Sequence, residues 1–434
     1  LKQHIQQLFD GGHENYKEIE RNKEILFAVD DRVKKIEKNG VNCANGFVTP
    51  EQYGAKGDGK ADDTAALVAA IAAASKSKTP LELKHGATYR FTEYIELESN
   101  LRIAGNDVVL LSDIQYDAPG QDRPSMGVTG SSNTGYKRDI RIEHVVFRPA
   151  DTCQCNMMFR VMRAENIYIG NCLFDCDLND HDRGCWDIYG AWRNVTFESC
   201  VFRQLTAGFA GGMWVRSWTD AVESSNCRIL NCDFYKAGGD EVLAVWGWNG
   251  VVKDVLISGC NFYEVDDAKY VSRGYYPAWF ITLGQRGLET DVRMEHCVVR
   301  VQHCEAVFRM LGAGTHAVVD NCDIYNIQPD DMPEHDPTKG AHSMLAQGEA
   351  KTTGANGSII QNCTVTLKGD AGRRVCYDLG TLRNNCFILD IGTGPSQTNF
   401  VVDNVFTGTL QKGLFWDCQT VRNNTADISL MNLS

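Results

Sequence analysis

The stretch IGNCLF (residues 169–174) recurs along the chain with small variations. Each copy places a cysteine after a polar or glycine residue and before a short run that favours β-structure. The further copies are FESCVF (197–202), LNCDF (230–234), SGCNF (258–262), EHCVV (295–299), DNCDI (320–324) and QNCTV (361–365). Repeats of this length with variable insertions are typical of solenoids, in which each coil stacks on the previous one. Since the repeated unit is strand-like, the sequence predicts a parallel β-helix.

The cysteines of these copies are predicted to form an inward ladder, because a small apolar thiol suits a stacked interior. They are Cys172, Cys200, Cys232, Cys260, Cys297, Cys322 and Cys363. Cys386 is interpreted as an eighth member, and His144 as a preceding member with histidine in the cysteine place. The steps from residue 144 are 28, 28, 32, 28, 37, 25, 41 and 23 residues.

Composition narrows the class of protein. A net charge of −13 without a basic stripe argues against a nucleic-acid partner. No run of 18 apolar residues occurs, so membrane insertion is not expected. The 17 cysteines contain no CxxC pair, and eight of them are assigned to the repeat position. We therefore expect free thiols and folding in a reducing cytoplasm rather than a disulfide framework or a zinc ribbon.

Residues 1–46 are predicted to form a helical coiled-coil stem. An apolar seam with heptad spacing runs through Ile19, Leu26, Val29, Val33 and Ile36. The alternative is a surface helix packed on the body. After the stem we expect a capping helix and first coils over residues 47–137, and the β-helix body over residues 138–434. Asp62 or Asp63 is predicted to cap a helix that reaches about residue 75.

The segment YGAKGDGKADDTAAL (residues 53–67) resembles the entry motif of the pectate-lyase-like superfamily. That motif opens many bacteriophage tailspikes and also polygalacturonases. The resemblance implies an all-β fold, a right-handed single-stranded parallel β-helix, and, with the stem, a homotrimer. It leaves the chemistry open, because the superfamily contains lyases, hydrolases, epimerases and inactive binders. The polygalacturonase signatures are missing, and Gly239-Asp240-Glu241 is the nearest approach to their Asp pair.

A second set of segments precedes the cysteine motifs. They are FRVM, WDIYG, MWVRS, LAVWG, FITLG, FRMLG and MLAQG, beginning at Phe159, Trp186, Met213, Leu243, Phe280, Phe308 and Met344. Strand alternation predicts that the first and third residues of each point inward. The second and fourth residues then point outward: Arg160, Met162, Asp187, Tyr189, Trp214, Arg216, Ala244, Trp246, Ile281, Leu283, Arg309, Leu311, Leu345 and Gln347.

Aromatic residues are concentrated in these segments, and a large exposed aromatic surface usually marks a binding site. Trp192, Trp218 and Trp248 follow the turn in three adjacent coils and are predicted to stack as an outer row. We therefore predict a sugar-binding surface; the alternative is a trimer interface. The predicted substrate-binding residues are Tyr189, Trp192, Trp214, Arg216, Trp218, Trp246, Trp248, Trp279 and Arg309.

Glycoside hydrolysis requires two carboxyl groups, placed at about 5–5.5 Å for retention or about 6.5–9.5 Å for inversion. The first candidate pair is Asp187 with Asp240 or Glu241, and Glu305 is a reserve. One would act as the general acid and the other as the base. A solvated surface carboxylate is the alternative for each.

A polysaccharide lyase is the other enzymatic possibility. Tyr189, Arg216 and Arg309 would then supply a base and neutralise a uronate. Some lyases of the superfamily use calcium, and Asp175, Asp177, Asp180 and Asp182 lie in a predicted acidic loop. That loop lacks the EF-hand glycine and terminal glutamate, so an acidic turn is favoured with bound calcium as the alternative, and no cofactor is predicted.

Together these features predict a phage tailspike-like protein that binds and depolymerises a bacterial surface polysaccharide, by hydrolysis rather than elimination. It would belong to the virion tail, be made in the host cytoplasm, and attach through a region that precedes Leu1. The alternatives are a non-catalytic glycan-binding spike and a secreted cellular lyase or hydrolase.

Overall fold

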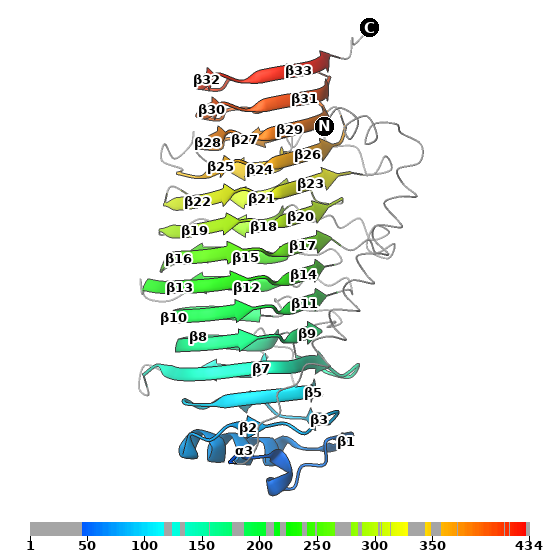
Figure 1. Ribbon diagram of the computed structural model, residues 1–434, viewed down its shortest axis with the longest axis vertical. Coiled ribbons are helices and arrows are strands. Elements are labelled where there is room, and N and C mark those ends of the chain that lie inside the picture. Colours follow the sequence, from blue (N-terminus) through cyan, green and yellow to red (C-terminus); the bar gives the residue numbers. More distant parts are fainter. Residues whose placement is uncertain are drawn as a thin grey trace.

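The computed structural model shows a parallel β-helix whose coils stack along one long axis (Figure 1). It describes residues 46–116, 124–130, 135–155, 157–175, 186–204, 212–217, 223–236, 241–247, 250–264, 279–284, 289–302, 304, 306–312, 314–328, 343–348, 357–370, 372–411, 413–415 and 417–430. Within these residues 33 strands join in one sheet, and every strand pairing is parallel. The all-β parallel helix expected from the cysteine repeat is therefore confirmed.

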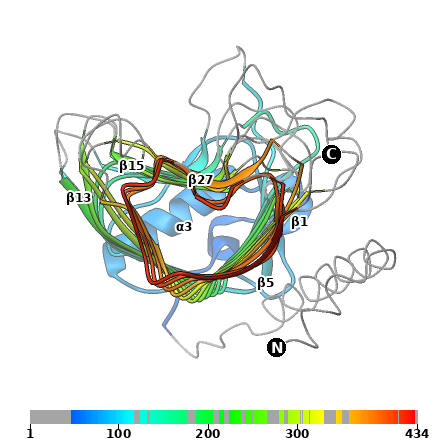
Figure 2. The same ribbon diagram turned by 90° about the horizontal axis from the view of Figure 1, so that it is seen from above.

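Each coil contributes to three faces, which are visible along the axis in Figure 2. Face A contains β1 (Asp58–Asp62), β3 (Thr88–Phe91), β9 (Leu173–Asp175), β11 (Val201–Gln204), β14 (Asp233–Lys236), β17 (Asn261–Glu264), β20 (Val298–Val301), β23 (Asp323–Ile327), β26 (Thr364–Lys368), β29 (Cys386–Ile391), β31 (Val405–Leu410) and β33 (Thr425–Leu430). Face B contains β4 (Ile95–Glu96), β6 (Pro124–Thr129), β12 (Met213–Ser217), β15 (Leu243–Gly247), β18 (Trp279–Leu283), β21 (Ala306–Met310), β24 (Ser343–Gly348) and β27 (Arg374–Tyr377).

Face C contains β2 (Leu81–Glu82), β13 (Glu223–Leu230), β16 (Val251–Ser258), β19 (Thr290–Glu295), β22 (Thr315–Asp320), β25 (Ile359–Gln361), β28 (Thr381–Arg383), β30 (Phe400–Val402) and β32 (Thr420–Arg422). Four long strands turn a corner. Strands β5 (Arg102–Ser112) and β7 (Lys137–Pro149) run from face C to face A, whereas β8 (Met157–Gly170) and β10 (Trp186–Glu198) run from face B to face C.

The N-terminal end of the described helix is covered by η1 (Pro50–Tyr53) and α3 (Thr64–Ser77), as Figure 1 shows. The two aspartates expected to cap α3 accept hydrogen bonds from different backbone N–H groups. Asp62 Oδ1 accepts the Thr64 N–H at 3.0 Å, whereas Asp63 accepts the N–H groups of Lys56 and Gly57 at 2.7 and 3.0 Å. The entry motif is thus tied to the start of the helix that closes the core.

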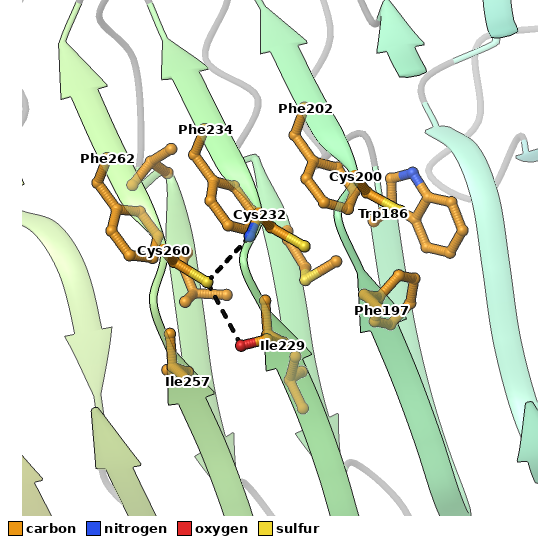
Figure 3. Packing of buried hydrophobic residues seen from close by; sticks show 14 of the residues in the cluster. Trp186, Phe197, Cys200, Phe202, Ile229, Cys232, Phe234, Ile257, Cys260 and Phe262 are labelled. Atoms are coloured by element: carbon orange, nitrogen blue, oxygen red, sulfur yellow. Dashed lines mark hydrogen bonds between the residues drawn. The ribbon is translucent and has the colours of Figure 1, made fainter. Parts of the chain in front are cut away.

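The seven repeat cysteines are free, buried thiols stacked at the corner between faces C and A, and three of them appear in Figure 3. Several of these thiols donate to a backbone carbonyl of the preceding coil, as Cys260 does to Ile229 at 3.3 Å. The residue before each cysteine turns the chain at positive φ, for example Asn171 at 52° and Asn231 at 54°. Asparagine tolerates this conformation better than most residues, which explains the recurring Asn-Cys pair.

Both ends of the predicted ladder are shifted by one residue. His144 has a φ of 59° and occupies the turning position, so Val145 takes the cysteine place. At the other end Cys386 pairs with Thr364, and Asn385 therefore follows Cys363 in the ladder. Asn385 and Asn404 continue the ladder through amide bonds of 3.0 Å to the next member. The predictions for His144 and Cys386 were wrong.

Aromatic rings fill the neighbouring inward position on face A. A stack passes through Phe147, Phe174, Phe202, Phe234 and Phe262, with successive centroids 4.7, 5.0, 4.7 and 4.7 Å apart. Figure 3 shows three of these rings beside the cysteines of the same coils. Parallel coils place like residues at the strand spacing, and this spacing suits offset ring stacking.

The predicted register on face B is correct for the coils that begin at Phe159, Trp186, Met213 and Leu243. It is wrong for the next coil, where Ile281 rather than Phe280 pairs with Leu243. Ile281 and Leu283 therefore point inward, and Thr282 takes the outward position.

In the β24 coil the register is also shifted, because Ala346 pairs with Phe308. Leu345 was predicted to point outward, yet it is fully buried within the core cluster.

The predicted coiled-coil stem lies outside the described residues, apart from Gly46. In the described part of the chain no helix has the length and apolar character needed to cross a membrane.

Candidate functional site

The pairings on face B align a row of outward positions along the helix axis. From one coil to the next the row reads Arg160, Asp187, Trp214, Ala244, Thr282, Arg309 and Gln347. Tyr189, Arg216 and Trp246 lie two residues further along their strands. We call these residues, together with Glu241 and Trp279, the face-B strip.

Asp187 and Arg216 form the centre of the strip. Arg216 Nε and Nη2 donate to the two carboxylate oxygens of Asp187 at 2.8 and 2.7 Å. Asp187 is 0% exposed and Arg216 is 5% exposed. Arg160 Nη2 lies 3.9 Å from the same carboxylate. Both Asp187 oxygens are thus committed to a bidentate ion pair, which holds its partners in a fixed geometry.

Aromatic rings pack around the Arg216 guanidinium. Its carbon lies 4.6 Å from the ring centroid of Trp214 and 5.1 Å from that of Tyr189. The indoles of Trp214 and Trp246 are 6.4 Å apart and inclined at 54°. All three rings are partly exposed. The outward placement predicted for Tyr189, Trp214, Arg216 and Trp246 on face B is therefore confirmed.

Glu241 lies on the other side of the strip, just before β15. Its Oε1 accepts a 2.8 Å hydrogen bond from the hydroxyl of Thr282, and its exposure is 8%. No ion pair joins Glu241 to a cation among the described residues. Its carboxylate therefore differs from that of Asp187, because no arginine among the described residues forms an ion pair with it.

Arg309 and Trp279 form a second guanidinium–aromatic group, on β21 and β18. The Arg309 guanidinium carbon lies 3.9 Å from the Trp279 ring centroid. The Trp279 indole N–H donates to Gln347 Oε1 at 3.2 Å and thereby orients the ring. Arg309 and Trp279, two of the predicted substrate-binding residues, are therefore in contact, whereas Gln347 was not among the predicted site residues.

Trp192 does not belong to the outer surface. It is 0% exposed, pairs with the core residue Ala164, and donates its indole N–H to the Arg216 carbonyl at 3.2 Å. The chain bends at Gly190, where φ is 74°, and the pairing register shifts between Tyr189 and Trp192. The inward and outward positions are therefore reset, and the prediction of a substrate contact for Trp192 is corrected to a core role.

Four further predicted site residues lie outside the described residues. They are Asp240, Glu305, Trp218 and Trp248.

A polar cluster at β4 and β6 extends face B toward the N-terminal end. Its residues were not among the predicted site residues. Tyr94 donates to Glu96 Oε2 at 2.5 Å, and the Thr129 N–H donates to Glu96 Oε1 at 2.7 Å. Lys137 Nζ lies 2.8 Å from the same carboxylate. Burial, followed by the charge of Glu96, raises the pKa of Tyr94. No cysteine motif marks these first coils, so the repeat offered no register for finding them.

The first aspartate of the predicted acidic loop lies in a strand and not in a loop, because Asp175 is the last residue of β9. Its carboxylate accepts bonds from Arg148 at 2.9 Å and from Arg203 at 3.0 and 2.6 Å. The other aspartates of that segment lie outside the described residues. Within the described ranges no group of three or more His, Cys, Asp or Glu side chains is arranged to hold a metal ion.

No protein-family model matches the chain. No curated protein shows a significant match to it.

Among solved structures, ORF18 of Geobacillus virus E2 is similar at 14% identity and a TM-score of 0.47, over 89% of this chain and 62% of that one. The tailspike of E. coli bacteriophage HK620, in complex with a pentasaccharide, has 12% identity and a TM-score of 0.47, over 88% and 80% of the two chains. A family 28 exopolygalacturonase of Yersinia enterocolitica has 12% identity and a TM-score of 0.49, over 90% and 79%. The chain thus spans about three fifths of the length of the Geobacillus virus protein. Phage tailspikes and a polygalacturonase are therefore among the structures it resembles, at low sequence identity.

Proposed function

We propose that this chain is a tailspike-like protein that binds a bacterial surface polysaccharide along the face-B strip and hydrolyses it. The observation that carries the proposal is the grouping of three partly exposed aromatic rings with buried acids and arginines on one face of a rigid helix. Aromatic rings supply flat apolar area for sugar faces, and polar groups between them fix orientation. The entry motif of residues 53–67 favours the same class of protein.

Within this proposal the two described acids have different roles. Asp187 is held by Arg216 through both oxygens, so its role is to position the Arg216 guanidinium among the rings. Among the described residues Glu241 accepts a hydroxyl bond from Thr282 and forms no ion pair, so it is the group suited to proton transfer. It would protonate the glycosidic oxygen as the bond to the anomeric carbon breaks, while a water supplies the new hydroxyl and loses its proton to a second carboxylate.

Asp240 and Glu305 remain candidates for that second carboxylate, alongside Asp187. Along the helix axis Asp187 and the Glu241 coil are two strand steps apart, or about 9.6 Å at about 4.8 Å a step. Glu241 also lies three residues before Ala244, which adds about 10 Å along the strand. The two displacements combine to about 14 Å between the backbone positions, which exceeds the about 6.5–9.5 Å of an inverting pair, so Asp187 is the least suited of the three candidates.

The experiment is incubation with a panel of purified bacterial capsules and O-antigens. New reducing ends without the ultraviolet absorbance of unsaturated uronates support hydrolysis, whereas reducing ends with that absorbance indicate a lyase and refute the hydrolytic role. Glu241→Gln should lower turnover at least 100-fold with little loss of binding. Glu198→Gln is the matched control, because Glu198 also accepts a hydroxyl bond, from Tyr168 at 2.9 Å, but lies on face C.

A non-catalytic glycan-binding spike is the second candidate, and the saturation of Asp187 by Arg216 favours it. Saturable binding to a capsule without new reducing ends would support this alternative. In either case we propose a homotrimer located in the virion tail, and sedimentation of the full chain tests the trimer.

A further inference from the structure

We propose that Cys153 and Cys155 form a redox-active thiol pair, which a small-molecule disulfide such as oxidised glutathione converts into a disulfide bond. The two residues lie in the segment between β7 and β8 and are separated by Gln154. Neither cysteine belongs to the cysteine ladder or to the face-B strip. The chemistry of the pair is therefore independent of the proposed function.

Both sulfur atoms contact one buried hydroxyl. Ser112 Oγ lies 3.5 Å from Cys153 Sγ and 3.7 Å from Cys155 Sγ, and Ser112 is 0% exposed. The Cys155 thiol also donates a hydrogen bond to Cys153 Sγ. Two residues of chain span at most about 7 Å between Cα atoms, and disulfides join Cα atoms about 4.4–6.8 Å apart. A small adjustment of this segment is therefore enough to bridge the pair.

Backbone hydrogen bonds hold the segment that carries the two thiols. The Cys153 N–H donates to the Ala150 carbonyl at 2.9 Å, and the Gln154 N–H donates to the Ile114 carbonyl at 2.9 Å. The side-chain oxygen of Gln154 accepts the Tyr116 N–H at 2.9 Å. A pair that is already held in contact loses less conformational entropy on forming a bond than a mobile pair does.

The two thiols differ in exposure, and this difference assigns their roles. Cys153 is partly exposed, whereas Cys155 is 0% exposed. Bonding from the Cys155 thiol lowers the pKa of Cys153 to about 6, and bonding to Cys153, together with burial, raises the pKa of Cys155. The thiolate is the nucleophile in exchange, so Cys153 attacks first and Cys155 second. The seven ladder cysteines are at most 2% exposed, which keeps an oxidant away from them.

The exchange proceeds in two steps. The Cys153 thiolate attacks one sulfur of the small-molecule disulfide, forming a mixed disulfide and releasing one thiolate. The Cys155 thiol then gives its proton to that thiolate, and its sulfur attacks Cys153 Sγ and releases the second thiolate. This second thiolate takes up the proton that Cys153 had lost to water. The two protein thiols are thus oxidised, and the small disulfide is reduced to two thiols.

The new bond closes a very short loop, so its effect on stability is small. In the chain-entropy description of disulfides, a loop of about three residues raises the Tm of a 434-residue chain by no more than about 2 °C. The pair therefore responds to the redox state of its surroundings, and it adds little to the stability of the β-helix.

The test is incubation of the reduced, folded full chain with oxidised glutathione at neutral pH, followed by acid quenching, alkylation and peptide mapping by mass spectrometry. We expect a peptide with an internal bond between Cys153 and Cys155, lighter by two hydrogen atoms and closed to alkylation until dithiothreitol is added. The bond should form at least about tenfold faster than Cys386 is modified, because Cys386 is a partly exposed thiol whose pKa is raised by burial.

Three variants check the assigned roles. Cys155→Ser should stop the reaction at the mixed disulfide of Cys153 with glutathione, and Cys153→Ser should leave Cys155 unreacted. Cys386→Ser is the matched control and should not change the bond between Cys153 and Cys155. Circular dichroism should show that the variants fold, and the mapping of the unsubstituted chain decides the question if a serine variant does not.

Two results with the unsubstituted, folded chain overturn the inference. In one, Cys153 and Cys155 both stay open to alkylation after the incubation. In the other, Cys153 stops at the mixed disulfide with glutathione or pairs with a cysteine other than Cys155.

Discussion

The buried ion pair between Asp187 and Arg216 permits a quantitative prediction. Asp187→Ala would leave a guanidinium that is 5% exposed without its bidentate partner. Loss of one member of a buried pair typically costs about 3–5 kcal/mol, because the remaining charge stays desolvated. An unfolding entropy of about 2.1 cal/mol/K per residue gives about 0.9 kcal/mol/K for 434 residues, so a cost of about 4 kcal/mol lowers Tm by about 4 °C.

The assay is a double-mutant cycle followed by thermal unfolding and by amide hydrogen exchange in β10 and β12. Asp187→Ala and Arg216→Ala should each destabilise the protein, and the double variant should be more stable than the sum of their effects implies. Asp254→Asn is the control, because Asp254 pairs with Arg228 at 2.7 Å while 62% exposed, and asparagine tolerates the positive φ of 52° at this position. That variant should change the free energy of unfolding by no more than about 0.5 kcal/mol. Single variants of the buried pair that change Tm by less than 1 °C, or a strictly additive cycle, would refute the reasoning.

The remaining predictions concern the core and one thiol. Phe234→Ala removes a ring stacked on both sides and should cost about 3–5 kcal/mol by chemical denaturation, whereas the 48% exposed Phe400 should tolerate alanine. Asn404→Ala removes amide bonds to two neighbouring coils, so peptide amides around β30 and β31 should exchange faster; unchanged protection would argue against the asparagine ladder. Bonding to the Cys155 thiol lowers the pKa of Cys153 to about 6, so its alkylation rate, mapped by mass spectrometry, should rise from pH 5 to 7 and then level off. Burial raises the pKa of Cys386, which should therefore still react slowly at pH 7; equal rates for the two thiols would contradict the assignment.

The cysteine repeat predicted the fold because one residue type occupies one structural position in seven coils. The same regularity fixed the register on face B from Phe159 through Leu243. The predicted register was wrong where successive residues are all apolar, because no alternation of polar and apolar residues then distinguishes the two faces of the strand. Phe280, Ile281 and Leu283 are all apolar, so a slip of one residue leaves the pattern unchanged while exchanging the two faces of the strand.

Part of the candidate site was predicted because it lies in strands with regular alternation. Tyr189, Trp214 and Arg216 lie within the regular part of face B, and their outward placement follows from alternation. Trp192 lies just beyond a bend at Gly190, which is not visible as a change in hydrophobic pattern. The bidentate bond from Arg216 to Asp187 could not be inferred from sequence either, because it depends on a side-chain conformation rather than on strand register.

The most direct test of the central claim is a crystal structure of the full chain with an oligosaccharide from the polysaccharide that it binds. We expect sugar density on face B, against Trp214 and Trp246. Density confined to face A or face C, with face B unoccupied, would contradict it.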